Sequence, residues 1–541
     1  MVNEHFLDPN NNSGRFAELN ELEEDYTRID LNEDKEVISG GGLIVDIRKD
    51  VESKISKALV DDSDTNSIIV SSTGAGKTRR ILSPYILSCI MANESILVHD
   101  PKGELYYFFI KLLIEHGYKV CVLNLRDPMT GDRYNFMQKA AELWQAGKHG
   151  RAIEVARGIA QTLYEPIMDK DDRFWTETAM NLFLCYFIIA CDILDAKDVS
   201  LASIYRIHIE GMVKLGASSR LKRYLDAHED SKCYELGIPS ATAPNDTRDS
   251  IFSVFSNGIV RVVLNEEIAD MMTRSTFDES DLSDENRPMA LFVITRDEAP
   301  QTYSTVVSSI IDTIYTSLVD KAQHMPTRRL PRRVHFILEE FGNIGALQNI
   351  NDMISASRSR GIRICAVVQS LCQLYLKYSA DLARVLVGNF QNLVYMASTD
   401  MELVKMISDR CGTMTDPYTK VSRPLMSPDR LTHLDKKRGE TLMLLDRHYP
   451  YITDLPDMSE YSMIPVSEAT VFEEREKTQI VRGVFAREVE RLVKQNAVTQ
   501  RSESARTTDM TPADTGRRRR EEYKISDLVK EIDEMIKEGE Y

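Results

Sequence analysis

From Ser67 onward, short runs of apolar and β-branched residues alternate with stretches of helical periodicity, and this alternation restricts the folds that the chain can adopt. It is typical of an α/β fold, in which helices cover a largely parallel sheet. The runs are apolar at almost every position, as expected for strands that are covered on both faces. We therefore predict eight strands, at residues 67–70, 95–99, 119–123, 289–295, 334–338, 362–368, 393–396 and 441–444.

A long segment, residues 136–284, separates the third predicted strand from the fourth and shows helical periodicity without a convincing strand. Ala156, Ile159, Ala160 and Leu163, for example, fall on one helical face. Because strand signals return at residue 289, we interpret this segment as an all-α domain inserted into the α/β domain, which then comprises residues 41–135 and 285–470. The sequence leaves open whether the insert gives rigid support, forms oligomer contacts or selects a substrate.

The two ends of the chain differ in composition from the rest. Residues 1–39 contain eleven Asp or Glu residues against three Lys or Arg and no apolar stretch like that of a signal peptide, so we predict an acidic flexible arm at residues 1–40. Residues 471–541 are predicted to form a helical and disordered tail, with disorder at residues 500–520. The amphipathic pattern at residues 525–536 suits a docking peptide and a helix packed on its own domain equally well.

Length and composition limit the class of protein. A chain of 541 residues is expected to form two or three domains. The net charge of −17 argues against a protein that coats nucleic acid over its whole surface, but it does not exclude a basic lining inside a pore. The longest apolar stretch, residues 182–191, is half as long as the roughly 20 residues that span a bilayer as a helix. We therefore predict a buried helix there, and membrane contact only through partners.

The first motif with chemical content is the loop Ser71-Ser72-Thr73-Gly74-Ala75-Gly76-Lys77-Thr78, which lies between a predicted strand and a helical pattern. A loop that binds polyphosphate must present backbone N–H groups without obstructing side chains, and Gly74 and Gly76 permit this approach. Lys77 is expected to contact the β- and γ-phosphates of ATP, and the Thr78 hydroxyl to ligate Mg²⁺. The predicted nucleotide-binding residues are therefore Thr73, Gly74, Ala75, Gly76, Lys77 and Thr78. Ser71 replaces the usual first glycine, which is acceptable if no positive φ is needed there.

Two carboxylates, Glu339 and Glu340, follow the predicted strand at residues 334–338. In a P-loop ATPase the first carboxylate of such a pair holds Mg²⁺, and the second orients and polarises the attacking water. We therefore predict Glu339 as a metal ligand and Glu340 as the catalytic base. Asp is usual at the first position, and the additional methylene of Glu339 displaces the carboxylate by about one bond length, enough to affect turnover.

An arginine and a polar residue flank the predicted strand at residues 362–368. Gln369 ends that strand beside the two carboxylates and is well placed to sense the γ-phosphate. Arg358, on the preceding helix, can act as an arginine finger on a neighbouring subunit's nucleotide or form a surface ion pair. Spacing alone does not decide between these two roles.

Taken together, several segments resemble the type IV secretion coupling proteins, the conjugative ATPases related to RecA and to chromosome-pumping translocases. These segments are the loop at residues 73–78, Asp100-Pro101-Lys102-Gly103-Glu104, Glu340-Phe341-Gly342-Asn343-Ile344-Gly345, residues 358–374 and Arg423-Pro424-Leu425. The likeness extends from about residue 65 to residue 455, with the motifs in the order expected.

The resemblance implies a RecA-like P-loop domain with an inserted all-α domain, and a homo-hexameric ring with ATP at the subunit boundaries. It implies that Lys77 contacts phosphate and Thr78 contacts Mg²⁺, and that Glu340 is the catalytic base. It also implies that Gln369 is the sensor of the γ-phosphate and Arg358 the arginine finger. The partners that it implies are DNA with its relaxase, and either the ATPases of the type IV secretion channel or a membrane adaptor. Most relatives begin with two membrane-spanning helices and this chain shows none, so we expect a cytoplasmic protein that partners recruit to the inner face of the cell membrane.

Three functions stay open at this point. The first is a motor that moves DNA, or a relaxase joined to DNA, to a conjugation pore. The acidic net charge is compatible with this motor if Arg220, Lys222 and Arg223, or other basic loops, line its channel. The second is an adaptor that binds nucleotide and recruits substrates with little turnover, a role suggested by Glu339. The third is a motor for effector proteins. The role of the signature at residues 100–104 does not follow from the sequence.

Overall fold

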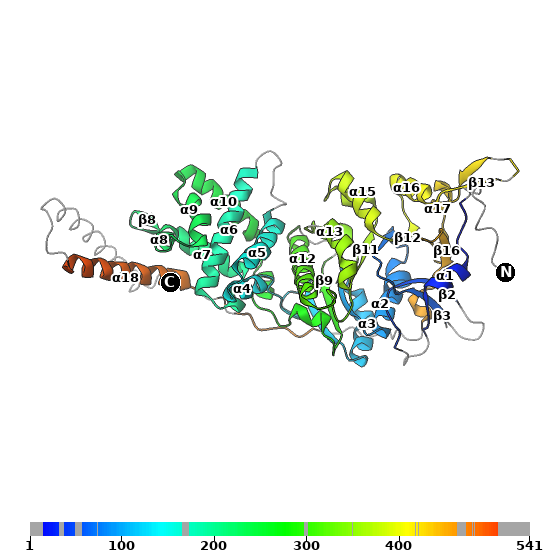
Figure 1. Ribbon diagram of the computed structural model, residues 1–541, viewed down its shortest axis with the longest axis horizontal. Helices are drawn as coiled ribbons and strands as arrows, with labels where there is room; N and C mark the ends of the chain where they lie inside the picture. Colours follow the sequence, from blue (N-terminus) through cyan, green and yellow to red (C-terminus); the bar gives the residue numbers. More distant parts are fainter. Residues whose placement is uncertain are drawn as a thin grey trace. The chain divides into compact units, whose positions relative to one another are not determined.

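The computed structural model describes residues 14–31, 37–48, 57–72, 74–164, 173–296, 301–348, 350–416, 418–419, 421–461, 472–478, 480 and 482–506. The chain forms two compact units (Figure 1). Unit 1 comprises Met1–Asp132 and Phe277–Glu474, and unit 2 comprises Arg133–Thr276 and Arg475–Tyr541. The chain thus leaves unit 1 to build most of unit 2, returns to complete unit 1, and ends in unit 2.

A nine-stranded sheet forms the centre of unit 1. Its strands are β4 (Ser67–Ser71), β5 (Ser95–Asp100), β6 (Lys119–Asn124), β9 (Met289–Ile294), β10 (Val334–Leu338), β11 (Ile362–Val368), β12 (Asn392–Ala397), β15 (Glu440–Leu445) and β16 (Tyr451–Asp454). Their order is β16-β15-β12-β4-β11-β10-β5-β9-β6. The strands from β12 to β6 pair in parallel, whereas β15 pairs antiparallel with β12 and β16 pairs antiparallel with β15. All eight predicted strands are present, and β16 is the strand of this sheet that lies outside the predicted set.

Helices make most of the connections between the parallel strands, because a parallel pair needs a long crossover. The helices of this part of unit 1 are α2 (Ser83–Met91), α3 (Glu104–Glu115), α12 (Gln301–His324), α13 (Ile350–Ser357), α14 (Leu371–Tyr375), α15 (Ala380–Asn389), α16 (Met401–Cys411) and α17 (Pro428–Thr432). Strands β5, β9, β10 and β11 are buried at every position. This burial accounts for their continuous apolarity, and the predicted α/β class is confirmed.

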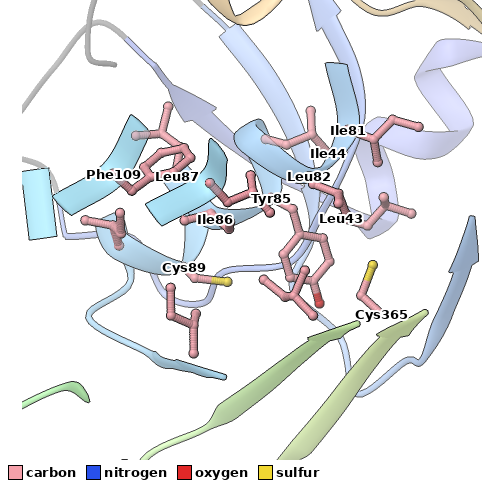
Figure 2. Close-up of a cluster of buried hydrophobic side chains, with 14 of the residues drawn as sticks. Leu43, Ile44, Ile81, Leu82, Tyr85, Ile86, Leu87, Cys89, Phe109 and Cys365 are labelled. Carbon is pink, nitrogen blue, oxygen red and sulfur yellow. The ribbon is translucent and has the colours of Figure 1, made fainter. Parts of the chain in front are cut away.

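Helix α2 shares its apolar core with both the central sheet and a small second sheet (Figure 2). The second sheet is antiparallel in the order β1-β3-β2, with strands β1 (Thr27–Asp30), β2 (Leu43–Arg48) and β3 (Lys57–Asp61). Tyr85 and Ile86 of α2 lie in one buried cluster with Leu43 of β2 and Cys365 of β11. The helix that follows the P-loop is therefore packed against elements from two sheets.

Part of the predicted acidic arm is structured. Helix α1 (Leu19–Asp25) and strand β1 lie within residues 1–40, and both Leu22 and Ile29 are buried. The prediction of a flexible arm is therefore wrong for residues 14–31, while residues 1–13 lie outside the described residues. Few apolar side chains suffice here because β3 supplies a strand edge and the core of unit 1 supplies an apolar surface.

Unit 2 is helical. Its helices are α4 (Gln138–Gln145), α5 (His149–Tyr164), α6 (Arg173–Ile193), α7 (Leu201–Met212), α8 (Arg220–Asp226), α9 (Lys232–Thr242), α10 (Asn245–Val263), α11 (Glu266–Met271) and α18 (Val484–Arg506). Helix α6 contacts α5, α7, α9 and α10. Among the described residues it is the one helix with the length and apolarity to cross a membrane, and 72% of its most apolar window is buried within the protein. The predicted buried helix at residues 182–191 is confirmed as part of this core helix.

Helix α18 packs on α7 and α8. Phe485 and Val489, one turn apart, are fully buried in this contact region. Residues 500–506 belong to α18, so the predicted disorder is wrong for them. The rest of the predicted disordered segment and the amphipathic pattern at residues 525–536 lie outside the described residues.

The basic residues of α8 are engaged within unit 2. Arg220 is buried, and its guanidinium lies 3.9 Å from a carboxylate oxygen of Glu490 in α18. Lys222 forms an ion pair one turn along its own helix, and Arg223 donates a hydrogen bond of 2.8 Å to the carbonyl of Leu215. The prediction that these residues line a channel is therefore wrong for Arg220, and it stays a prediction for Lys222 and Arg223, which are partly exposed.

Candidate nucleotide-binding site

Four neighbouring strands, β4, β11, β10 and β5, end at one edge of the central sheet. Because they run in parallel, the residues that follow them lie side by side, and this edge is where open α/β sheets bind their ligands. Lys77 lies in the loop after β4, Gln369 follows β11, Glu339 and Glu340 follow β10, and Asp100 ends β5. The fold thus brings together residues from four distant parts of the chain.

The loop after β4 has the backbone of a phosphate cradle. Gly74 and Gly76 adopt positive φ angles of 75° and 96°, a region that residues with side chains rarely enter. Ser71 is the last residue of β4 and does not have a positive φ, so its substitution for the usual glycine causes no strain. The loop leads into a π-helical turn at Thr78–Leu82 and then into α2. Thr73 lies outside the described residues.

Side chains of this loop meet the two glutamates that follow β10. The Thr78 hydroxyl donates a hydrogen bond of 2.7 Å to Oε1 of Glu339. Lys77 Nζ lies 3.6 Å from Oε1 of Glu340, which is an ion pair but too long for a hydrogen bond. Within the described residues the buried Lys77 amine makes no hydrogen bond. A buried ammonium with unused donors at a glycine-containing loop fits a phosphate oxygen.

Two carboxyl groups at this edge, those of Glu339 and Asp100, are buried, and burial disfavours their ionised form. Burial raises the pKa of Glu339 above its ordinary value, although the Thr78 hydrogen bond and the Lys77 charge oppose this. Burial also raises the pKa of Asp100 to about 7, and the neighbouring charge of Glu339 adds to the effect. One oxygen of Asp100 accepts the N–H of Tyr106 at 2.9 Å, and the other has no hydrogen-bond partner in the described part of the chain. A divalent cation would stabilise the ionised form of such a pair, so these residues fit Mg²⁺ as well as phosphate.

Glu340 lies in an unusual backbone conformation. Its φ and ψ are 52° and 47°, in the left-handed region, which costs a residue other than glycine on the order of 1–3 kcal/mol. Asn343 stabilises the turn, because its side-chain amide donates to Oε2 of Glu340 at 2.9 Å and its backbone N–H donates to the Glu340 carbonyl at 2.7 Å. Backbone strain of this kind is concentrated at functional sites, and here it orients the carboxylate that faces Lys77.

Gln369 lies between the two loops, because β11 is the strand between β4 and β10. Its backbone N–H donates to Oε1 of Gln373 at 3.1 Å, and its carbonyl accepts the Ser398 hydroxyl at 3.3 Å. The residue is therefore fixed at the edge beside Lys77 and Glu340.

Arg358 is not brought together with the other predicted site residues. It lies on the short turn Arg358–Arg360 at the amino end of β11, whereas Gln369 lies at the carboxyl end. A seven-residue strand spans about 23 Å at about 3.3 Å per residue, so Arg358 cannot reach the nucleotide site of its own chain. Its side chain is exposed and forms no ion pair with any residue that the structure describes. The alternative role of Arg358 in a surface ion pair therefore has no support.

Two arginines that the motif does not specify anchor the P-loop helix. Arg79 forms a bidentate pair with Asp457, with N···O distances of 2.8 and 2.5 Å, and Arg80 donates to the carbonyl of Leu455. The segment after β16 thereby fixes the turn that carries Thr78. No sequence signal identified these contacts, since Asp457 follows a strand that was itself outside the predicted set.

The sequence model of the family described as "Type IV secretory system Conjugative DNA transfer" matches residues 30–437, about three-quarters of the chain. The chain belongs to this family. The conjugal transfer protein TraG of Rhizobium radiobacter is 23% identical over 372 residues, which cover 66% of this chain and 54% of TraG. VirD4 of Agrobacterium fabrum is 23% identical over 429 residues, which cover 72% of this chain and 58% of VirD4. The chain therefore spans little more than half of the length of these relatives.

Solved structures of the plasmid coupling protein TrwB share the fold. TrwB in complex with the ATP analogue ADPNP superposes with a TM-score of 0.61 at 15% identity, covering 84% of this chain and 96% of TrwB. The unbound monoclinic form of TrwB without its first 70 residues gives a TM-score of 0.57 at 16% identity, covering 75% and 88%. The predicted RecA-like P-loop fold with an all-α domain is confirmed by this likeness.

A Glu339→Gln substitution is expected to weaken Mg²⁺-dependent nucleotide binding by about 10- to 100-fold in apparent Mg²⁺ affinity, because it removes the charge beside Thr78. Titration of Mg²⁺ against a fluorescent ATP analogue measures the effect without requiring turnover. Glu267→Gln, on an exposed helix of unit 2, is the matched control. An unchanged Mg²⁺ midpoint in the Glu339 variant would remove Glu339 from the metal site.

Proposed function

We propose that this protein is an ATPase that couples ATP hydrolysis to the delivery of DNA, or of a relaxase joined to DNA, to a type IV secretion channel. The observation that carries the proposal is the meeting of Lys77 and Thr78 with Glu340 and Glu339 at the ends of neighbouring strands. The names of the relatives support the cargo, since TraG is a conjugal transfer protein. The solved complexes of TrwB with ADPNP and with ADP and Mg²⁺ support the cofactors.

The P-loop binds the phosphates of ATP. Backbone N–H groups of the loop, Gly74 and Gly76 included, approach the phosphate oxygens without steric hindrance, and the Lys77 ammonium contacts the β- and γ-phosphates. Because Lys77 then turns toward the phosphates, its ion pair with Glu340 weakens and the glutamate is released. Lys77 therefore pairs with Glu340 until a nucleotide binds, and the phosphates then replace Glu340 as the negatively charged partner of the ammonium.

Thr78 and Glu339 would hold Mg²⁺, which would neutralise charge on the phosphates when bound. Glu340 orients and polarises the attacking water as the general base, held by Asn343 in the required direction. Gln369, on the strand between the two loops, contacts the terminal phosphate. Each of these roles belongs to a side chain at the same sheet edge.

Arg358 completes the site of a neighbouring subunit, so the active form is a homo-oligomer, which the family resemblance indicates to be a hexameric ring. An exposed guanidinium at the amino end of β11 suits this role because it is too far from its own P-loop. The channel's other ATPases or a membrane adaptor recruit the ring from the cytoplasm to the inner face of the membrane.

The decisive experiment measures steady-state ATPase activity with and without single- and double-stranded DNA at several salt concentrations. We expect stimulation by DNA that falls as the salt concentration rises, because phosphate contacts release counterions. ATPase activity that is insensitive to DNA and stimulated by secreted proteins would identify a motor for effector proteins instead.

One observation favours a second function. Glu339 stands where Asp is usual, so the contact of its carboxylate with Mg²⁺ would be displaced by about one bond length, although the carboxylate accepts the Thr78 hydroxyl at 2.7 Å. Slow turnover would suit an adaptor that binds nucleotide as a conformational ligand and recruits substrates. Nucleotide binding with DNA transfer that survives loss of hydrolysis would establish this adaptor role.

A further inference from the structure

The segment that follows Gln369 wraps around the loop that carries Glu340. We call residues 369–378 the sensor segment and residues 340–347 the Glu340 loop. They follow neighbouring strands, β11 and β10, and touch at three places in the described structure. None of the motifs identified from the sequence explains these contacts.

Lys377 makes the central contact. Its amine donates hydrogen bonds to two carbonyls of the Glu340 loop, that of Phe341 at 3.1 Å and that of Ile344. The amine lies among protein atoms, and this burial lowers the pKa of Lys377 to about 7. A partly buried amine bridging two backbone carbonyls three residues apart fixes the curvature of the loop between them.

Two further contacts flank Lys377. The Gln373 side chain lies against Gly342, where an added Cβ would come within 2.4 Å of Gln373 Oε1. The same Oε1 accepts the backbone N–H of Gln369 at 3.1 Å. At the other end, the Tyr378 hydroxyl accepts the backbone N–H of Leu347 at 3.0 Å. The sensor segment therefore contacts the Glu340 loop near its beginning, in its middle and at its end.

We propose that Lys377 is a positioning residue that makes the sensor segment and the Glu340 loop move as one body, so that contact of Gln369 with the terminal phosphate sets the position of Glu340. The inference rests on the proposed ATPase function. Its physical basis is that three hydrogen bonds join the two segments, because Lys377 donates to two carbonyls of the Glu340 loop and the Tyr378 hydroxyl accepts the backbone N–H of Leu347. Displacement of a catalytic group by about 1 Å is enough to lower turnover about 100-fold.

The test compares Lys377→Met, which keeps the length of the side chain and removes its charge and donors, with Lys405→Met on the exposed face of α16. We expect kcat for ATP to fall about 10- to 100-fold in Lys377→Met, with the Kd for ADPNP within about twofold of wild type. Lys405→Met is expected to match wild type in both quantities. Gly342→Ala, which displaces Gln373 from the other side, is expected to give the same split between kcat and Kd.

Amide hydrogen exchange supplies a readout that a purely structural role would not move. In the wild-type protein, ADPNP is expected to protect the sensor segment and the Glu340 loop together. In Lys377→Met, ADPNP is expected to protect the sensor segment alone. Joint protection in the variant, or a kcat within twofold of wild type, would overturn the inference. Failure of the wild-type protein to bind ADPNP would instead overturn the proposed function, and the inference with it.

Discussion

Glu340→Gln is expected to lower ATP turnover by at least about 100-fold while leaving nucleotide binding close to that of the wild-type protein. The substitution keeps the size of the side chain and its hydrogen bond with Asn343, but it removes the carboxylate that we propose as the base for the attacking water. Loss of a positioned general base typically costs about 10²- to 10⁴-fold in rate. Since the proposed phosphate contact is made by Lys77 and not by Glu340, affinity for ADPNP should not fall.

Steady-state ATPase assays and ADPNP titration measure the two effects separately. Glu229→Gln, an exposed position in unit 2, is the control for loss of one negative charge. Turnover within tenfold of wild type would show that another group is the base. DNA transfer in cells then separates the two candidate functions, because a motor stops when Glu340→Gln blocks hydrolysis and an adaptor does not.

The second large effect concerns stability, and it arises from a buried ionic network at the opposite, amino end of the sheet. Glu94 accepts hydrogen bonds from the backbone N–H of Gly41 at 3.0 Å, from His335 at 2.6 Å and from Arg333 at 3.0 Å. His335 is fully buried on β10 and also contacts the Tyr85 hydroxyl at 3.1 Å. One carboxylate thus joins the central sheet, the helix after the P-loop and the segment before β2.

Glu94→Ala is expected to lower the free energy of unfolding of unit 1 by about 3–5 kcal/mol, since it leaves the fully buried His335 without its carboxylate partner and Arg333 with only the longer pair to Asp64 at 3.6 Å. Chemical denaturation monitored by circular dichroism measures the change. Glu115→Ala, which removes one partner of an exposed pair on α3, is the control and should cost no more than about 0.5 kcal/mol. A cost below about 1 kcal/mol at Glu94 would show that water replaces the network.

The effect of Glu94 should depend on pH in a defined direction. Burial alone would raise the pKa of this carboxyl, but the hydrogen bond from His335 and the charges of His335, Arg333 and Arg363 outweigh it, so the pKa is lowered from 4.5. A carboxyl whose pKa is lower in the folded state stabilises that state above the unfolded pKa and loses this contribution as pH falls through the folded pKa. The difference between the wild-type protein and Glu94→Ala should therefore be constant above about pH 5 and shrink below about pH 4.5.

The central sheet and the P-loop were predictable because their signals are local. Strands buried on both faces are apolar throughout, and a glycine-containing loop that ends in Lys-Thr between a strand and a helix is specific for phosphate binding. The order of the strands, by contrast, is set by packing, and only that order places Gln369 between Lys77 and Glu340. The sequence identified candidate site residues but not their arrangement.

The errors came from contacts that are distant in the chain. An acidic composition suggested a flexible arm, yet Leu22 and Ile29 meet the core of unit 1. The basic sequence of α8 suggested an exposed surface, yet Arg220 is paired with Glu490, far along the chain. Lys377 carries no sequence signal at all, since its role depends on two backbone carbonyls across the sheet edge.

Strand β11 has a consequence for how a ring of such subunits would operate. Gln369 follows one end of this buried strand and Arg358 precedes the other, so in the proposed ring Gln369 would face the subunit's own nucleotide and Arg358 that of a neighbour. A β-strand packed on both faces barely stretches, so a shift imposed at one end reappears at the other. In such a ring β11 would connect adjacent active sites rigidly. Hydrolysis in one subunit would then displace Arg358 at the next site, and hydrolysis would proceed around the ring in sequence.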